Sequence, residues 1–134
     1  PRVPHVAVDS FIDWDSHSWT QVDKPGRAPA TLARIAAGRA KFGRRFVAPF
    51  YGSGSGATGR SIHRPIGTLT TVDRWAVVDG DRMRVLQPSE NLAIMTFKRD
   101  TILPPVKRDA MKLIGNAVAP IVARDLLRAV QAQA

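Results

Sequence analysis

The spacing of apolar residues in the first half of the chain predicts one helix and one strand. Over residues 30–42 the apolar side chains share one helical face, and Gly43 supplies a stop. Residues 44–50 favour a strand. Residues 1–28 show little periodicity, so we expect mostly irregular structure there, with a short strand near residues 6–8.

Residues 68–86 carry a β pattern interrupted by one tight turn. Residues 68–71 and 75–78 are rich in β-prone side chains, and residues 82–86 continue the pattern. The pair Asp79-Gly80 is typical of a two-residue hairpin turn. We therefore expect a small antiparallel sheet.

The last third of the chain predicts helices. Gln87-Pro88-Ser89-Glu90 favours a helix start, because proline suits the first helical position and glutamate suits the positive end of the helix dipole. A short helix over residues 107–114 is expected to end at Gly115. Pro120 opens a final helix with one apolar stripe, formed by Ile121, Val122, Leu126, Ala129 and Val130.

These patterns predict an α+β fold in two regions. Residues 1–86 form a β-rich region with one basic helix, and residues 87–134 form a helical region. At 134 residues the chain is long enough for one compact domain or for a lobe that completes a larger one.

Positive charge is concentrated in one segment. The chain has 20 basic and 11 acidic residues, a net charge of +9. Residues 24–72 contain no acidic residue. Their basic residues are Lys24, Arg27, Arg34, Arg39, Lys41, Arg44, Arg45, Arg60 and Arg64. The remaining residues balance at 11 of each sign, so this segment carries the whole net charge. We expect it to contact phosphates, with an ordinary solvated surface as the alternative.

Composition excludes several kinds of chemistry. The chain has no cysteine, which excludes disulfides, thiolate zinc sites and a cysteine nucleophile within it. His5, His17 and His63 fall at no spacing that indicates a metal site. No apolar run approaches the ~20 residues needed to cross a bilayer. We therefore expect a cytoplasmic protein with no metal and no membrane partner.

A glycine-rich loop inside the acid-free segment is the first candidate site. Gly52, Gly54 and Gly56 permit close backbone approach to bases or phosphates, with Ser53 and Ser55 as adaptable donors; a passive linker is the alternative. Two arginines follow this loop. We expect Arg60 to contact a guanine edge and Arg64 to contact the DNA backbone. The alternative is that either arginine makes either type of contact.

Three motifs follow one another in a specific order. The glycine loop precedes residues 59–71, which include Thr68-Leu69. Next comes Arg84-Val85-Leu86-Gln87-Pro88-Ser89-Glu90, and then residues 112–120 with Gly115-Asn116-Ala117-Val118. In this order and spacing they resemble the target recognition domain and the ninth and tenth motifs of DNA cytosine-5 methyltransferases of bacterial or phage type. Residues 11–15 and 31–38 resemble the entry to that domain more weakly.

The resemblance implies roles for several residues. The glycine loop would enter the major groove of double-stranded DNA, and Thr68 would lie near the backbone of the flipped nucleotide, with Leu69 beside it. Asn116 and the backbone of Ala117 would contact the methionine end of S-adenosylmethionine. The C-terminal helices would pack on a Rossmann-like catalytic core supplied elsewhere.

One segment departs from the family pattern. After the ninth motif the family continues with Arg-Gly-Phe-Pro or Arg-Gly-Tyr-Pro. Here the chain reads Met95-Thr96-Phe97-Lys98, and Phe97 alone is kept.

The chemistry of cytosine methylation requires groups that this chain lacks. A thiolate must attack the ring, a carboxylic acid must assist it, and the target base must leave the stack. The family supplies the first two from Pro-Cys and Glu-Asn-Val motifs. This sequence has no cysteine, and Glu90, its one glutamate, is placed at a helix start. We expect no activity from the chain alone.

Two classes of function remain open. The first is a fragment or small subunit of a DNA cytosine-5 methyltransferase, working with a catalytic half in cis or in trans. The second is a stand-alone DNA-binding protein derived from such an enzyme. A basic structural protein that binds RNA or a membrane surface has only the charge in its favour.

Overall fold

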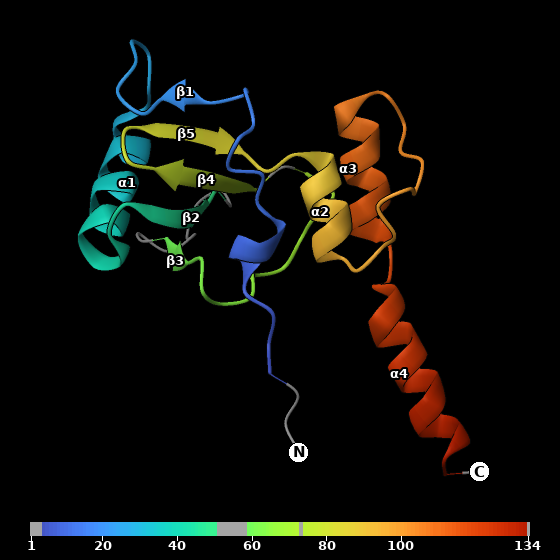
Figure 1. Ribbon diagram of the computed structural model, residues 1–134. Helices are drawn as coiled ribbons and strands as arrows, with labels where there is room; N and C mark the ends of the chain where they lie inside the picture. Colours follow the sequence, from blue (N-terminus) through green and yellow to red (C-terminus); the bar gives the residue numbers. More distant parts are fainter. Residues whose placement is uncertain (1–3, 51–58, 73, 134) are drawn as a thin grey trace. The chain divides into compact units, whose positions relative to one another are not determined.

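The computed structural model describes residues 4–50, 59–72 and 74–133, which form two compact units (Figure 1). The sheet unit comprises Pro1–Thr68 with Asp73–Leu86. The helical unit comprises Leu69–Val72 with Gln87–Ala134. The α+β class predicted from the sequence is confirmed.

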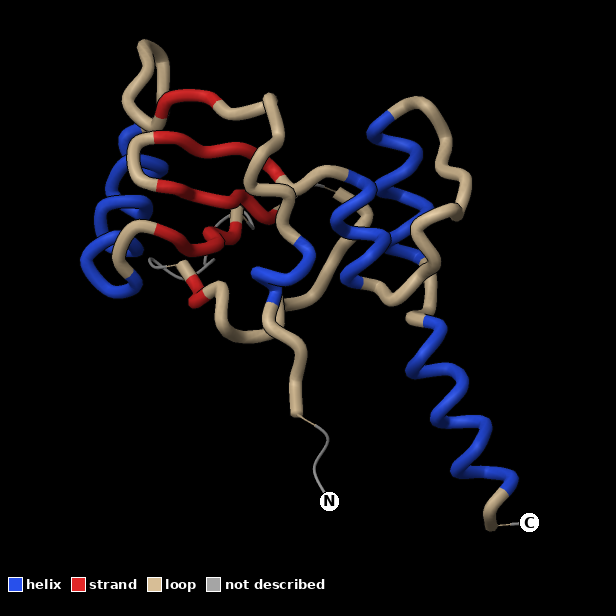
Figure 2. Tube along the Cα trace, viewed as in Figure 1, coloured by secondary structure: helices blue, strands red, loops and turns tan. Residues whose placement is uncertain are grey.

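The sheet unit contains one α-helix and a five-stranded antiparallel sheet of order β1-β5-β4-β2-β3 (Figure 2). Its elements are the 3-10 helix η1 (Val8–Phe11), β1 (Thr20–Gln21), α1 (Pro29–Phe42), β2 (Arg45–Pro49), β3 (Arg60–Ser61), β4 (Trp75–Asp79) and β5 (Arg82–Val85). All five residues of β4 are buried, as expected of a central strand covered on both faces.

Helix α1 packs closely against the sheet because it carries a glycine where the two meet. Pro29 opens the helix, one residue before the predicted range, and Gly43 ends it as predicted. Ile35 is buried with Phe46 in the main core cluster. A Cβ on Gly38 would lie 2.3 Å from the Phe46 ring. The glycine that weakens the isolated helix therefore permits its packing.

The predicted hairpin is confirmed, but two predicted strands are wrong. β4 and β5 pair around Gly80, whose φ of 60° suits the tight turn. Residues 6–8 do not form a strand, since Val8 starts η1 and its N–H donates to the carbonyl of Arg64 at 3.0 Å. Residues 68–71 are irregular, and the hydroxyl of Thr70 donates to the Val72 carbonyl at 2.9 Å.

The helical unit contains α2 (Pro88–Ile94), α3 (Lys107–Asn116) and α4 (Pro120–Gln131). The predicted start of α2 is confirmed as a capping box, in which the Gln87 N–H donates to the Glu90 carboxylate at 2.6 Å. Leu92, Met111 and Ile114 form the core between α2 and α3.

Helix α3 does not stop at Gly115 as expected but continues to Asn116. A Cβ on Gly115 would lie 2.5 Å from the backbone of Thr70 and Thr71. The glycine therefore makes room for residues 69–72 against the helix. It does not serve as a left-handed stop.

Helix α4 starts at Pro120 as predicted, yet it buries none of its residues. Within the helical unit it extends away from α2 and α3 (Figure 1). Its large apolar side chains are 44–67% exposed: Ile121, Val122, Leu126, Leu127 and Val130. No helix in the described part of the chain is long and apolar enough to span a bilayer.

Candidate DNA interface

The glycine-rich loop lies outside the described residues, so the roles expected for Gly52, Ser53, Gly54, Ser55 and Gly56 remain predictions. The description resumes at Gly59. Residues from Gly59 to Ile66 form one side of a hollow of about 540 Å³ on the sheet unit, here called the β3 hollow. Its lining residues are Lys41, Phe42, Gly59, Arg60, Ser61, Arg64, Pro65 and Ile66.

Three cations from three elements line the β3 hollow. Lys41 comes from the last turn of α1, Arg60 from β3, and Arg64 from the turn that follows β3. All three are exposed, and no carboxylate within the described ranges forms an ion pair with them. The sequence predicts Arg60 and Arg64 as site residues. It presents Lys41 as only one of nine basic residues, because the proximity of Lys41 depends on how α1 packs against the sheet.

The guanidinium of Arg60 is held over an aromatic ring. Its central carbon lies 5.5 Å from the centroid of the Trp75 ring. The indole N–H of Trp75 donates to the Thr68 carbonyl at 3.1 Å. A Cβ on Gly67 would lie 2.6 Å from the same ring and 3.1 Å from an Arg60 nitrogen. This packing limits the rotamers of Arg60, as a planar base contact requires.

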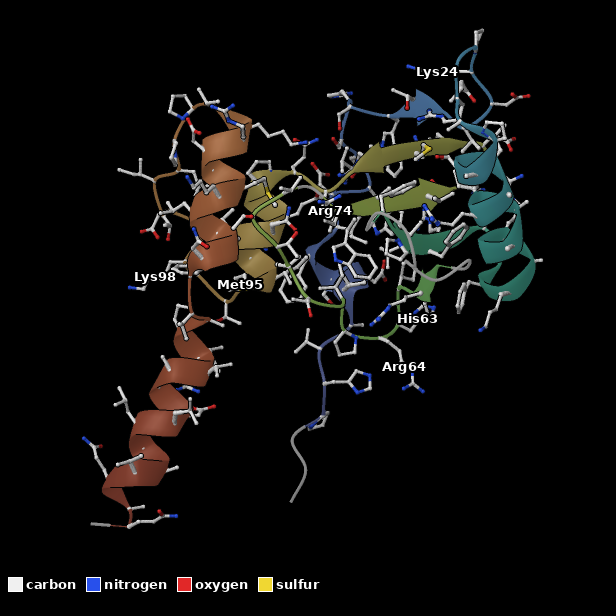
Figure 3. The ribbon with its side chains drawn as sticks, turned by 180° about the vertical axis from the view of Figure 1, so that it is seen from behind. Lys24, His63, Arg64, Arg74, Met95 and Lys98 are labelled. Atoms are coloured by element: carbon white, nitrogen blue, oxygen red, sulfur yellow. The ribbon has the colours of Figure 1, made fainter. Side chains whose placement is uncertain are left out.

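Arg64 differs from Arg60 in its surroundings. Its backbone is fixed, since its carbonyl accepts the Val8 N–H at 3.0 Å. Its side chain points away from the sheet into solvent, beyond the β3 edge (Figure 3). Lys24 lies in the loop after β1, at the opposite edge of the sheet (Figure 3). An exposed cation such as Arg64 suits a phosphate contact.

Several of the nine basic residues are engaged within the protein. Arg27 donates to the carbonyls of Gln21 and Val22 at 2.7 and 3.1 Å. Arg39 donates to the Gly80 carbonyl at 2.7 Å. Residues 24–72 contain no acidic residue, but in the folded protein carboxylates from the β4–β5 hairpin contact this segment.

Asp79 is the carboxylate at the centre of this arrangement. It is 1% exposed and forms ion pairs with Arg44, Arg45 and Arg82 at 2.7, 3.3 and 2.8 Å. Burial raises its pKa, but hydrogen bonds from the three guanidinium groups outweigh burial and lower the pKa to about 2. In the sequence, Asp79 is recognisable only as a turn-forming aspartate, and no local pattern indicates the cluster.

The two tryptophans near the N-terminus pack within the protein. Trp14 and Trp19 stack at 6.2 Å between centroids. Arg45 lies over Trp14 at 4.3 Å, and Arg82 lies over Trp19 at 4.6 Å. These rings therefore contact the arginines around Asp79.

Thr68 and Leu69, to which the resemblance assigns a place at the DNA, lie at the junction of the two units. Thr68 is exposed in the sheet unit, where its carbonyl accepts the Trp75 indole. Leu69 is half-buried in the helical unit. The structure brings Thr68 close to Trp75 and, through that ring, to Arg60.

The end of α3 presents the residues expected to contact a cofactor. Asn116 is exposed, and its amide offers both a donor and an acceptor, which suits the carboxylate and ammonium groups of a methionine moiety. The Ala117 N–H already donates to the Ile114 carbonyl at 3.1 Å. The end of α3 thus presents one exposed polar side chain, that of Asn116.

Thr96 occupies the position where the family pattern has glycine. Its φ of 64° lies in the left-handed region that glycine favours and a β-branched residue rarely adopts. Its hydroxyl accepts the Ile121 N–H, at the start of α4, at 3.3 Å. A left-handed backbone conformation therefore forms here without glycine, and the hydroxyl satisfies an N–H that α4 leaves unpaired.

No group of three or more histidine, aspartate or glutamate residues that would hold a metal occurs in the described residues.

Comparisons with known proteins identify a family. No curated protein matches the chain, and no solved structure matches it. The sequence model of the C-5 cytosine-specific DNA methylases matches residues 15–132, which is most of the chain. The chain therefore belongs to the C-5 cytosine-specific DNA methylase family.

Proposed function

We propose that this chain is the DNA-recognition and cofactor-pocket-completing portion of a DNA cytosine-5 methyltransferase, catalytically incomplete on its own. The observation that carries the proposal is the β3 hollow, where Lys41, Arg60 and Arg64 converge without a carboxylate partner in the described residues. Exposed cations gathered from three elements suit the backbone of duplex DNA.

Within the hollow the cations divide into two roles. Arg60, held over Trp75, makes the bidentate contact to a guanine edge in the major groove. Lys41 and Arg64 neutralise phosphates. The glycine loop from Gly52 to Gly56 precedes β3 by a few residues and approaches the same groove.

The catalytic groups come from elsewhere, in cis or in trans. These 134 residues contain no cysteine, and the carboxylate of Glu90 is buried in the capping box of α2. Glu90 is thus unavailable as the acid that assists attack on the cytosine ring. S-adenosylmethionine, the methyl donor of this family, would be held between Asn116 at the end of α3 and the catalytic portion.

The apolar face of α4 is the surface by which the chain joins the catalytic portion. Ile121, Leu126 and Val130 are 44–67% exposed, and an isolated helix of 12 residues is marginal in water. An exposed apolar face marks a protein contact, which favours a portion that joins a catalytic partner over a DNA-binding protein that works without one.

Binding of duplex DNA over a range of salt concentrations tests the recognition role. We expect the 134-residue chain to bind at low salt, with affinity that falls steeply as salt rises. Changing Lys41 or Arg64 to glutamine should lower the slope of log K against log salt by about 0.9 for each phosphate left without its cation. Lys24→Gln removes the same charge at the opposite edge of the sheet and should leave the slope unchanged.

Arg60→Gln separates base contact from backbone contact. It should reduce discrimination between the preferred site and other duplexes, by about 1–3 kcal/mol for one bidentate contact. Selection of bound sequences from a random pool supplies the preferred site. Absence of duplex binding at low salt, or equal effects of Lys24→Gln and Lys41→Gln, would refute the proposal.

A further inference from the structure

A second hollow lies at the β4–β5 hairpin of the sheet unit and is lined almost entirely by charged or polar groups. Its volume is about 370 Å³, and we call it the hairpin hollow. Its lining residues are Gln21, Arg44, Asp79, Gly80, Asp81 and Arg82. The Asp79 carboxylate at its base is 1% exposed, whereas the Arg44 side chain is 74% exposed.

The hydrogen bonds to Asp79 use only part of what the arginines offer. One carboxylate oxygen accepts from the Nε atoms of Arg44 and Arg45 at 2.7 and 3.3 Å. The other accepts from Nε and Nη2 of Arg82 at 3.2 and 2.8 Å. Each guanidinium has five N–H donors in a fixed fork. The terminal amino groups of Arg44 donate to no acceptor in the described part of the protein, and they remain open to a ligand.

The cluster carries an excess of positive charge. Three guanidinium groups around one carboxylate leave a local charge of +2. The nearby pair of Arg39 and Asp81 adds none, because the two form an ion pair at 3.2 Å. Asp79 stays ionised at neutral pH, since its pKa is about 2. The Asp79 carboxylate holds the Nε sides of the arginines in place, and their outer amino groups remain available to a ligand.

We infer that the hairpin hollow is a second phosphate-binding site for the same DNA duplex, with Asp79 orienting Arg44 and Arg82 so that their outer amino groups contact one backbone phosphate. A guanidinium held at one edge by a carboxylate is preorganised to bind a phosphate through the other. This inference rests on the proposed DNA-recognition function and extends it to a residue cluster outside the β3 hollow.

The two hollows take cations from nearby positions in the chain. Lys41 lines the β3 hollow and Arg44 lines the hairpin hollow. They are three positions apart in the chain, so their Cα atoms lie no more than about 11 Å apart. This upper limit is small on the scale of a DNA duplex, and the inference therefore assigns both cations to the same duplex.

The salt dependence of duplex binding tests the inference with single-charge variants of the full 134-residue chain. Arg44→Gln should lower the slope of log K against log salt by about 0.9, as expected when one phosphate is left without its cation. Asp79 keeps Arg45 and Arg82 as partners in this variant, so the hairpin is retained. Arg99→Gln removes an exposed arginine from the loop between α2 and α3 and should leave the slope unchanged.

Asp79→Asn gives a second and sharper readout. It raises the net charge from +9 to +10, so binding that depends on total charge alone would strengthen. We expect binding to weaken instead, because the arginines lose the carboxylate that orients them. Circular dichroism establishes that the variant is folded, and Arg44→Gln carries the test if it is not.

The possible outcomes separate the inference from the function on which it rests. If Arg44→Gln leaves the slope unchanged while Lys41→Gln lowers it, the hairpin hollow is not a phosphate site and DNA recognition stands. If Arg99→Gln lowers the slope as much as Arg44→Gln, only total charge matters and the inference fails. If the unaltered chain does not bind duplex DNA at low salt, both the proposed function and the inference fail.

Discussion

Helices α1 and α4 have similar lengths and similar starts but very different surroundings. Both begin with proline, and they span 14 and 12 residues. α1 buries Ile35 and Gly38 against the sheet of its own unit, whereas α4 buries nothing in its unit. Sequence periodicity alone makes the two look equivalent, because each carries an apolar face. Their packing shows that the apolar face of α1 has its partner within this chain, while no residue of α4 is buried in the described part of the helical unit.

The contrast extends to the charged residues. In the sheet unit, Arg27, Arg39, Arg44 and Arg45 bond to carbonyls or carboxylates of the same unit. On α4, Arg124 forms an ion pair with its neighbour Asp125, at 2.8 Å. The arginines of the sheet unit are thus bonded to other parts of that unit, whereas the ion pair of Arg124 is local to its own helix.

Truncating one apolar side chain in each region should show the difference most clearly. Phe46 is fully buried beneath α1, and Phe46→Ala should lower the free energy of unfolding by about 3–5 kcal/mol. Leu126 is 62% exposed on α4, and Leu126→Ala should change the same free energy by less than about 0.5 kcal/mol. Urea unfolding followed by circular dichroism measures both. Similar losses at the two positions would mean that α4 is buried in solution.

The glycine in α3 tests how residues 69–72 pack within the helical unit. An added Cβ at Gly115 meets the backbone of Thr70 and Thr71 at 2.5 Å, and backbone cannot move aside as a flexible side chain can. Gly115→Ala should therefore destabilise the unit by about 1–3 kcal/mol in thermal or urea unfolding. At an open helical site the same change would stabilise by about 1 kcal/mol, and a gain of that size would contradict the packing.

The Asp79 cluster predicts a pH dependence confined to the sheet unit. The pKa of Asp79 is about 2 in the folded protein, below the ordinary value of 3.8, so its stabilising effect is complete above about pH 5. The effect is lost as pH falls through 4 toward 2. The three arginines are partly exposed and screened, so we expect a loss of about 1–2 kcal/mol. Urea unfolding of Asp79→Asn should lack this component, and an identical acid profile in that variant would argue against the cluster.

Substitutions at Thr96 should have the smallest effects. Thr96→Asn keeps a side-chain acceptor for the Ile121 N–H and tolerates the φ of 64°, so it should stabilise the helical unit by up to about 1 kcal/mol. Thr96→Ala keeps the strained φ and loses the acceptor, so it should destabilise by about 1 kcal/mol. A shift in melting temperature of opposite sign for the two variants is the expected result, and shifts of the same sign would refute this explanation.

Local patterns are sufficient to predict most elements but not their contacts. α1, the β4–β5 hairpin and the starts of α2 and α4 follow from spacing, turn chemistry and proline position. The irregular path of residues 68–71 does not, because it depends on the contact between Gly115 and Thr70, which are 45 positions apart in the chain. β-propensity in such a segment is outweighed by tertiary contacts.

In the candidate site, too, local patterns predict some residues but not the contacts between them. Arg60 and Arg64 are predictable from their place after the glycine loop, and both line the β3 hollow. The roles of Lys41 and Trp75 depend on how α1 packs against β3 and on the place of β4 in the sheet, which no local pattern encodes. Asp79 is predictable only as a turn residue, since its arginine partners are up to 35 positions away.

Methyl transfer to duplex DNA from labelled S-adenosylmethionine tests the central claim most directly. The assay compares this chain alone, the cognate catalytic portion that carries the nucleophilic cysteine, and the two joined in cis or mixed in trans. We expect transfer only when both are present, and weaker transfer when Leu126→Asp places a charge on the apolar face of α4. Methyl transfer by this chain alone, or full activity of the catalytic portion without it, would contradict the account.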